Sequence, residues 1–358
     1  MSKSAIIIGA GIGGLTAAHA LRQMGWKTQT FERANAFSEV GAGIQLSPNA
    51  TRILSRLNLL DSVKANSFEP EAATIRDGKT GSALMYAPLK GYCQRYYGGP
   101  YLHVYRPMLQ SVLAKGVDVQ LGCDIASYDP TQLTVAADGF RSALRAQMNG
   151  PSDPEFRGQV AWRGVVTADS RLKALIPEEA CVWVGPEKHL VTYYIGPELI
   201  NFVAVTEQDQ WLEEGWNTPG DLNELRDHFS NWHPKLGEIL DACTSVQRWG
   251  LFDRPALARW VDGKTALLGD AAHPTLPFLA QGAALAIEDA WALARNASDL
   301  TKYEKIRKPR ATRLQSWARA NAKLYHKSRL IDRLKLLVSR RIFRGPQALL
   351  LFWSIFSG

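Results

Sequence analysis

The sequence predicts an α/β fold that begins with a Rossmann-like unit and has a β-rich unit in its middle. Residues 5–8 form an apolar run, a Gly-x-Gly-x-x-Gly turn occupies residues 9–14, and residues 13–24 have a helix-like pattern. Dinucleotide-binding folds begin with this order of strand, turn and helix. With 358 residues, 46% of them apolar, the chain is long enough for about two domains.

Each glycine of the first turn has a separate physical role. Gly9 permits the tight turn, Gly11 lets the backbone approach a pyrophosphate, and Gly14 lets the helix pack on the strand. The helix N-terminus offers free N–H groups to phosphates. Glu32 ends a second strand-like run 18 residues after Gly14. Its carboxylate would bind ribose hydroxyls and repel a 2′-phosphate, so the turn predicts FAD or NAD rather than NADP.

Two later segments favour FAD over NAD, although a glycine-rich turn alone would also fit an ordinary strand-to-helix connection. Residues 265–268 form a short apolar run that ends in Gly269 and Asp270, and Gly282 opens a helix-like stretch. A carboxylate at a strand end suits a ribityl hydroxyl. A helix N-terminus suits the flavin edge where negative charge collects on reduction. Together with Asp138 in the middle of the chain, these segments predict an FAD site.

The chain resembles the single-component FAD-dependent aromatic hydroxylases, in the branch of the salicylate, 3-hydroxybenzoate and 6-hydroxynicotinate hydroxylases. The resemblance runs from residue 5 to about residue 328. It rests on these segments in order: GAGIGGLTAAHALRQMGW with FER, GAGIQLSPNATRIL, YRPMLQSVL, ADGFRSALR, WRG, GDAAHPTLPFLAQGAALAIEDA and NAKLYHKS.

This resemblance implies a Rossmann-like FAD-binding domain of the glutathione-reductase type, a β-sheet substrate domain and C-terminal helices. The expected boundaries are residues 1–72, 101–154 and 258–300 for the FAD-binding domain, 73–100 and 155–257 for the substrate domain, and 301–358 for the helical region. The residues that it places at FAD are Gly9, Gly11, Gly14, Glu32, Arg33, Arg106, Asp138, Asp270, Gly282 and Ala283, with Pro277 beside the flavin.

The middle of the chain is expected to bind the substrate. Besides β-like runs at residues 162–166, 180–185, 190–195 and 199–205, it has a helix-like stretch at 221–228, which predicts an antiparallel sheet with a helix across it. His189, Val191 and Tyr193 fall on one face because side chains alternate along a strand. An imidazole and a phenol on one face suggest a hydrogen-bonding relay for a phenolic substrate. Alternatively, both are half-buried groups that bond to the backbone.

In the hydroxylases that this chain resembles, an HxxxY pair at this place lines the substrate pocket, and His189 and Tyr193 match it. Gln281 is expected to bond to substrate or flavin. By resemblance, NADH or NADPH binds transiently and reduces FAD, and dioxygen forms a C4a-hydroperoxyflavin. This species hydroxylates a small electron-rich aromatic substrate of phenolic or hydroxypyridine type. Two alternatives are a flavoenzyme that acts on an alkene or a quinone-like lipid, and a non-catalytic flavin-binding protein.

Two departures from the family pattern concern the region before Asp138. The chain has Tyr105 before Arg106 where family members usually have histidine, and the stretch between residues 117 and 138 is too short for the usual β-hairpin. The four cysteines lack metal-ligand or disulfide spacing, so we expect reduced thiols, no metal site and a cytoplasmic protein.

Positive charge is concentrated near the C-terminus. Residues 302–344 contain 15 Lys and Arg against two acids, a net charge of +13 in a chain whose total is +8. Apolar residues recur there at helical spacing, among them Leu334 and Leu337. We expect this tail to dock on the body, in preference to contact with an anionic membrane surface. No base-reading module is visible, so nucleic acid is not an expected partner.

Overall fold

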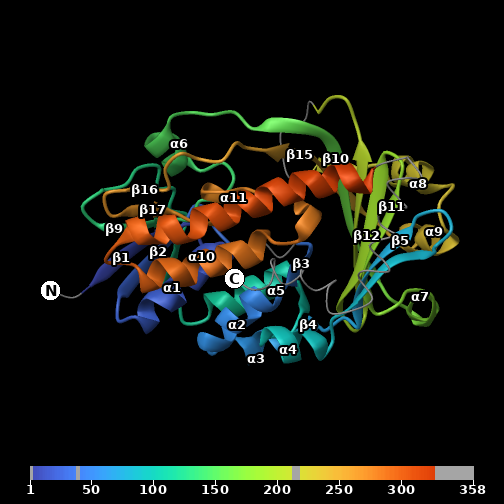
Figure 1. Cartoon of the computed structure of the whole chain (residues 1–358), viewed down its shortest axis with the longest axis horizontal. Coiled ribbons are helices and arrows are strands. Elements are labelled where there is room, and N and C mark those ends of the chain that lie inside the picture. The colour runs from blue at the N-terminus through green and yellow to red at the C-terminus, as the bar shows by residue number, and fades with distance from the viewer. Residues whose placement is uncertain (1–2, 38–40, 212–217, 327–358) are drawn as a thin grey trace.

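The computed structural model describes residues 3–37, 41–211 and 218–326. A six-stranded sheet with its helices forms one end of the molecule, and an eight-stranded sheet forms the other (Figure 1). A small three-stranded sheet lies between them, made of β3 (Gly43–Leu46), β7 (Leu102–Tyr105) and β4 (Ser67–Phe68). The mixed α/β class predicted from the sequence is confirmed.

The six-stranded sheet gathers segments from the whole length of the chain. Its order is β16 (Val261–Asp262), β17 (Thr265–Leu267), β9 (Leu133–Ala136), β1 (Ser4–Ile8), β2 (Lys27–Glu32) and β8 (Val119–Leu121). All neighbours pair in parallel except β16 and β17. The carboxyl ends of parallel strands meet at one edge, so the segments that follow β1, β2, β9 and β17 lie side by side.

Helices cover this sheet and fix its packing. Helix α1 (Ile12–Gln23) packs against α10 (Gly282–Arg295), and Leu15 and Ile287 are fully buried in the shared core. A Cβ at Gly13 would lie 3.2 Å from the Ala286 Cβ of α10 and 2.5 Å from a Leu268 methyl, so glycine favours the close approach of the two helices. The remaining helices of this end are α2 (Pro48–Arg56), α3 (Leu60–Lys64), α5 (Arg106–Ala114) and α6 (Ala143–Asn149).

The eight-stranded sheet contains all four β-like runs predicted for the middle of the chain. Its order is β14 (Thr218–Gly220), β15 (Val246–Asp253), β10 (Glu155–Thr167), β13 (Leu199–Glu207), β12 (Lys188–Gly196), β11 (Glu179–Gly185), β5 (Ala72–Asp77) and β6 (Ala83–Pro88). The pairing is antiparallel apart from the parallel pair β11 and β5. The predicted helix is α8 (Leu222–Phe229), which with α9 (Pro234–Asp241) covers one face.

Helix α11 (Leu300–Tyr325) runs from the six-stranded sheet to the eight-stranded sheet (Figure 1). Near its start, the buried Tyr303 hydroxyl donates a hydrogen bond to the Leu267 carbonyl at 2.9 Å. Near its end, Ala318 and Ala322 pack in one apolar cluster with Trp249 of β15. The helix therefore ties the two sheets together. The tail docking expected through Leu334 and Leu337 lies outside the described residues.

Two short helices, α4 (Tyr92–Tyr97) and α7 (Ser170–Leu175), complete the described elements together with two 3-10 turns, η1 (Gly269–Ala271) and η2 (Pro277–Leu279). Residues 122–132 contain no strand, and β9 leads directly into the Asp138 segment, as the short sequence there indicates. Within the described ranges, no helix combines the length and the apolar character needed to span a bilayer.

Candidate active site

The glycine turn after β1 has the geometry that the sequence predicts. Gly9 has a φ of +100°, and a Cβ there would lie 2.3 Å from the Ala137 carbonyl oxygen. A Cβ at Gly14 would lie 1.9 Å from the Gly9 carbonyl oxygen. A Cβ at Gly11 would meet no atom within 4 Å. Gly9 and Gly14 therefore permit close packing, whereas the backbone at Gly11 stays open to the approach of a ligand.

The first turns of α1 and α10 are both suited to negative charge. Neither helix has a side-chain cap at its N-terminus, and neither has an acidic residue in its first turn. The first backbone N–H groups of a helix have no partner within the helix and carry partial positive charge. The start of α1 suits a pyrophosphate. The start of α10, at Gly282 and Ala283, suits the flavin edge on which charge develops.

Glu32 lies at the end of β2, next to the glycine turn. Its carboxylate accepts hydrogen bonds from the backbone N–H groups of Ala10 at 2.8 Å and Ala34 at 3.0 Å. These bonds hold the carboxylate in the position where it would bind ribose hydroxyls. Arg33, which follows it, is exposed.

Asp138 and Asp270 follow the neighbouring strands β9 and β17. One Asp138 oxygen accepts a bond from the Leu144 N–H at 3.3 Å, and the other is buried with no partner in the described structure. Burial raises the pKa of Asp138. The Asp270 residue is accessible to solvent. Desolvation of its carboxyl group by the surrounding protein raises the pKa of Asp270, and the nearby His273 and Arg106 oppose this effect. An orphaned acceptor and an accessible carboxylate fit the hydroxyl groups of a bound cofactor.

Asp289 of α10 anchors the Gly269–Asp270 turn, although it is not among the predicted site residues. Its carboxylate accepts a bond from the Gly269 N–H at 3.2 Å, contacts His273 and pairs with Arg307 Nε at 2.7 Å. Burial raises the pKa of Asp289, but His273 and Arg307 outweigh this effect and lower the pKa to about 2. The position of Asp270 therefore depends on a buried ionic network.

Gln281 is buried and bonded to protein groups. Its amide nitrogen donates to Ser47 Oγ at 3.0 Å, and its oxygen accepts from Asn49 at 3.2 Å. Asn49 also donates to Glu288 at 2.7 Å. These bonds link the start of α2 to the start of α10. The contact of Gln281 with substrate or flavin stays a prediction. Pro277 begins η2, four residues earlier in the chain.

His189 and Tyr193 lie on the same face of β12 but have separate partners. The Nδ1 atom of His189 is 2.7 Å from Nε2 of His326, and its ring packs near Phe278 of η2. The Tyr193 hydroxyl donates to the Gly43 carbonyl at 2.8 Å. Four residues of strand span roughly 13 Å. A direct relay between His189 and Tyr193 is therefore not formed, because each side chain is held by a different segment.

Their surroundings give these two groups fixed protonation states. Burial lowers the pKa of His189 well below its usual range, and the neighbouring His326 lowers it further. Burial raises the pKa of Tyr193. At neutral pH, His189 is therefore an uncharged imidazole and Tyr193 is a protonated phenol.

Gly43 of β3 forms two hydrogen bonds with side chains of the eight-stranded sheet. Asn201, the cross-strand partner of Tyr193, accepts a hydrogen bond from the Gly43 N–H at 2.8 Å. A Cβ at Gly43 would lie 2.5 Å from the Tyr193 ring. Gly43 lies in the GAGIQLSPNA segment, but its role depends on contacts between segments more than 140 residues apart.

Positive charge collects near Tyr193. Arg163 of β10 donates to Gln247 at 3.1 Å and lies over the Trp249 ring. Burial lowers the pKa of Arg163, Tyr193 opposes this effect, and the nearby charge of Arg106 lowers the pKa further. Two arginines from different units of the fold therefore face the same region.

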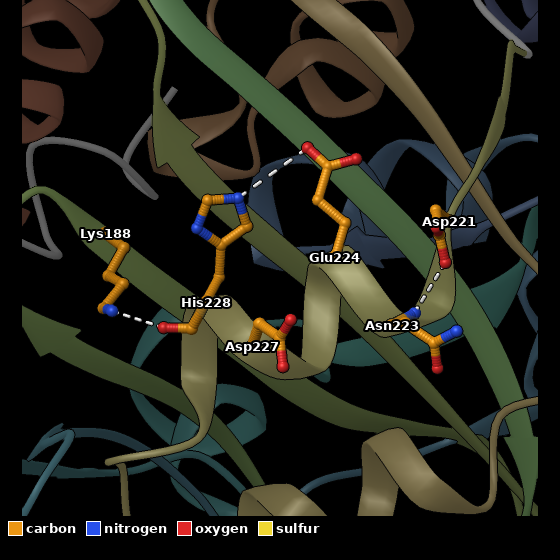
Figure 2. A pocket seen from close by; sticks show the side chains of 6 residues that line it. All are labelled: Lys188, Asp221, Asn223, Glu224, Asp227 and His228. Carbon is orange, nitrogen blue, oxygen red and sulfur yellow. Dashed lines mark hydrogen bonds and ion pairs between the residues drawn. The ribbon is translucent and has the colours of Figure 1, made fainter.

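A separate hollow of about 560 Å³ lies beside α8 (Figure 2). Because side chains alternate along β12, Lys188 at this hollow and the adjacent His189 lie on opposite faces of the sheet. Lys188 points to this side and donates a hydrogen bond to the His228 carbonyl. Six residues line the hollow: Lys188, Asp221, Asn223, Glu224, Asp227 and His228. None of these is a predicted site residue.

Known proteins similar to this chain also bind FAD or are monooxygenases. A family model described as an FAD binding domain matches residues 130–318, and one described as an NAD(P)-binding Rossmann-like domain matches residues 7–44. The chain is 34% identical to 3-amino-4-hydroxybenzoate 2-monooxygenase of Streptomyces platensis, over 91% of each chain. It is 32% identical to 6-hydroxynicotinate 3-monooxygenase of Pseudomonas fluorescens, over 88% of this chain and 91% of the relative.

Solved structures agree on the fold. The structure of Klebsiella pneumoniae HpxO with FAD and uric acid has a TM-score of 0.85 and 26% identity, with 98% of this chain and 97% of the other covered. A salicylate hydroxylase substrate complex has a TM-score of 0.78 and 22% identity, with 98% and 95% covered. The chain therefore belongs to the FAD-dependent aromatic hydroxylases and is a flavoprotein monooxygenase.

Proposed function

We propose that this enzyme uses NADH or NADPH and dioxygen to hydroxylate a small electron-rich aromatic compound of phenolic or hydroxypyridine type. The observation that carries the proposal is His189. It is an uncharged, buried imidazole on the sheet face next to Phe278, and η2, which contains Phe278, leads into the N-terminus of α10. A base in that position can accept the proton of a ring hydroxyl.

The described residues fit FAD, and the bound flavin would supply reduction by NAD(P)H and transfer of one oxygen atom from dioxygen. In this proposal the glycine turn and Glu32 hold the nucleotide half, and Asp138 and Asp270 bind its hydroxyl groups. The first turn of α10 stabilises negative charge on the ring system. His189 accepts the proton of the substrate hydroxyl at Nε2, which raises the electron density of the aromatic ring.

The charge of the region favours a substrate that carries an acid group. The charge of Arg106 is close enough to act on Arg163, which is half-buried. A carboxylate near them would reduce their mutual repulsion. The names of the relatives support this choice, because they describe monooxygenases of hydroxybenzoates and of 6-hydroxynicotinate.

The proposal is tested by a screen of phenolic and pyridinic acids. NAD(P)H consumption, hydrogen peroxide and hydroxylated product would be measured together, since peroxide without product marks a compound that only stimulates the flavin. We expect at least one acid to give product that contains oxygen from labelled dioxygen. Product from an alkene or a quinone-like lipid, with none from any aromatic acid, would support the competing flavoenzyme hypothesis. No stimulated NAD(P)H consumption at all would support a non-catalytic role.

A further inference from the structure

We propose that Glu207 and His326 are positioning residues that hold His189 in the tautomer with its proton on Nδ1, so that Nε2 is free to act as a base. This inference rests on the proposed function for the role of His189. The state of the histidine itself can be measured whether or not a substrate is found.

The three side chains come from three separate elements. His189 is in β12, Glu207 ends β13, and His326 directly follows α11. His189 Nδ1 is 2.7 Å from His326 Nε2, and His326 Nδ1 is 2.9 Å from a Glu207 carboxylate oxygen. Backbone bonds fix this arrangement, because the Glu187 N–H donates to the His326 carbonyl and the Glu207 N–H donates to the Glu187 carbonyl.

The chemistry of the groups sets the direction of each hydrogen bond. An ionised carboxylate can only accept, so His326 donates from Nδ1 and its Nε2 carries a lone pair. This lone pair accepts the bond from His189, whose proton must then be on Nδ1. The Gln159 amide is also near His326 Nδ1, at 3.2 Å. The contact with Glu207 is shorter and involves a charge, so the carboxylate determines the tautomer.

The remaining nitrogen of His189 is free for chemistry. Its Nε2 has no hydrogen-bond partner within the described ranges of the chain, while the ring is flanked by Phe278 and Tyr325. When a substrate hydroxyl gives its proton to Nε2, the O–H bond breaks, an N–H bond forms and His189 becomes an imidazolium. His326 then accepts a hydrogen bond from a positively charged ring, and this bond is stronger than one from the neutral ring.

Burial changes along the three residues in a way that suits this role. His189 is 2% exposed, and the side chains of His326 and Glu207 are 3% and 47% exposed. Burial lowers the pKa of His326, whereas the charges of Glu207 and Glu187 raise it. Glu207 therefore places a negative charge at the end of β13, where water solvates it, and its effect reaches His189 through His326. A charge placed directly against His189 would itself be buried.

The test uses full-length, FAD-loaded enzyme with nitrogen-15 in its histidine rings. Ring nitrogen spectra distinguish a protonated from an unprotonated Nδ1, and His189→Gln and His326→Gln assign the two signals. We expect His189 to carry its proton on Nδ1 in the unaltered enzyme. We expect Glu207→Gln to shift it toward a mixture of the two tautomers. Glu198→Gln is the matched control, since Glu198 is 74% exposed at the other end of the β12 and β13 hairpin.

A His189 proton found on Nε2 in the unaltered enzyme would overturn the inference. So would a tautomer that Glu207→Gln leaves unchanged. We expect both Glu variants to retain the FAD content and the melting temperature. These two measurements show whether an altered spectrum comes from loss of cofactor or from partial unfolding. Because these spectra require no substrate, they can contradict the inference without reference to the proposed function.

A second readout uses any acid that the screen shows to be hydroxylated. Glu207→Gln should lower kcat by about tenfold, with KM nearly unchanged, the lower end of the range for acid-base assistance. It should also move the acid limb of the pH profile to lower pH, because loss of the negative charge lowers the pKa of the His189 imidazolium. An acid limb that does not move would contradict the role of Glu207. A failed screen would contradict the proposed function alone.

Discussion

The two faces of the eight-stranded sheet have the same backbone but different tasks. One face, beneath α8 and α9, is a dry cluster that includes Trp162, Trp183 and Phe202. The other face, toward β3 and α11, carries the polar side chains of His189 and Tyr193. Because side chains alternate along each strand, one segment can supply both faces. We therefore expect the first face to contribute mainly to stability and the second, under the proposed function, to the chemistry.

Substitution of one residue on each face should change a different property of the enzyme, and His189→Ala should have the largest effect on turnover. We predict that His189→Ala lowers hydroxylation by roughly tenfold to a thousandfold, with normal FAD content and stability, because it removes the base. Phe202→Ala, on the opposite face, should instead lower the free energy of unfolding by about 3 to 5 kcal/mol. Turnover per folded, FAD-loaded molecule should persist in Phe202→Ala. Equal loss of turnover in both variants at equal folded fraction would show that the two faces do not differ in function.

Asp270→Ala tests the cofactor site and leaves both faces of the sheet intact. We predict noncovalently bound FAD in the unaltered protein and weaker binding, by about tenfold or more, in the variant, because a charged hydrogen-bond acceptor is lost. Titration of apoprotein with FAD would measure this change. The melting temperature of the apoprotein should stay the same, because the Asp270 side chain is accessible. Unchanged FAD affinity would show that Asp270 does not contact the cofactor.

A third prediction concerns His103 of β7, whose ring packs against Tyr193 at 4.8 Å between ring centres. Burial lowers the pKa of His103 to about 3, from 6.5. The unfolded chain therefore binds the extra proton first, and stability falls as pH drops below 6.5. Between pH 7.5 and 5 this histidine alone should cost about 2 kcal/mol.

His103→Gln can keep the bond to the Tyr194 carbonyl and cannot take up a proton. Denaturant unfolding at the two pH values should show a smaller loss in this variant than in the unaltered protein. An equal loss in both would place the acid sensitivity elsewhere.

The smallest expected effect compares two neighbouring tyrosines. The Tyr193 hydroxyl bonds to the Gly43 carbonyl at 2.8 Å, and the Tyr194 hydroxyl, on the opposite face, bonds to the Ile176 carbonyl at 3.2 Å. Each change to Phe should cost about 1 kcal/mol of stability, because each removes one hydrogen bond. Only Tyr193→Phe should also lower hydroxylation, by roughly tenfold or more. Equal turnover in the two variants would remove Tyr193 from the substrate site.

The features that depend on short segments could be predicted from the residues alone. The strands that lead to Gly9, Glu32 and Asp270, the sheet runs of the middle and the helix that became α8 are local patterns of apolar spacing and glycine. The parallel pairing of these strands then brings their ends together at one edge. For this reason the cofactor side could be predicted in some detail.

The hydrogen bonds between polar side chains of distant segments depend on how the folded elements pack. His189 and Tyr193 were expected to form a relay, but His326 and Gly43 take these bonds from positions 137 and 150 residues away. Gln281 was expected to bond to substrate or flavin, which stays a prediction, and the structure adds amide bonds to Ser47 and Asn49. A hydrogen bond needs atoms within about 3 Å. Periodicity along the chain cannot supply that distance for residues that meet only when separate sheets and helices pack.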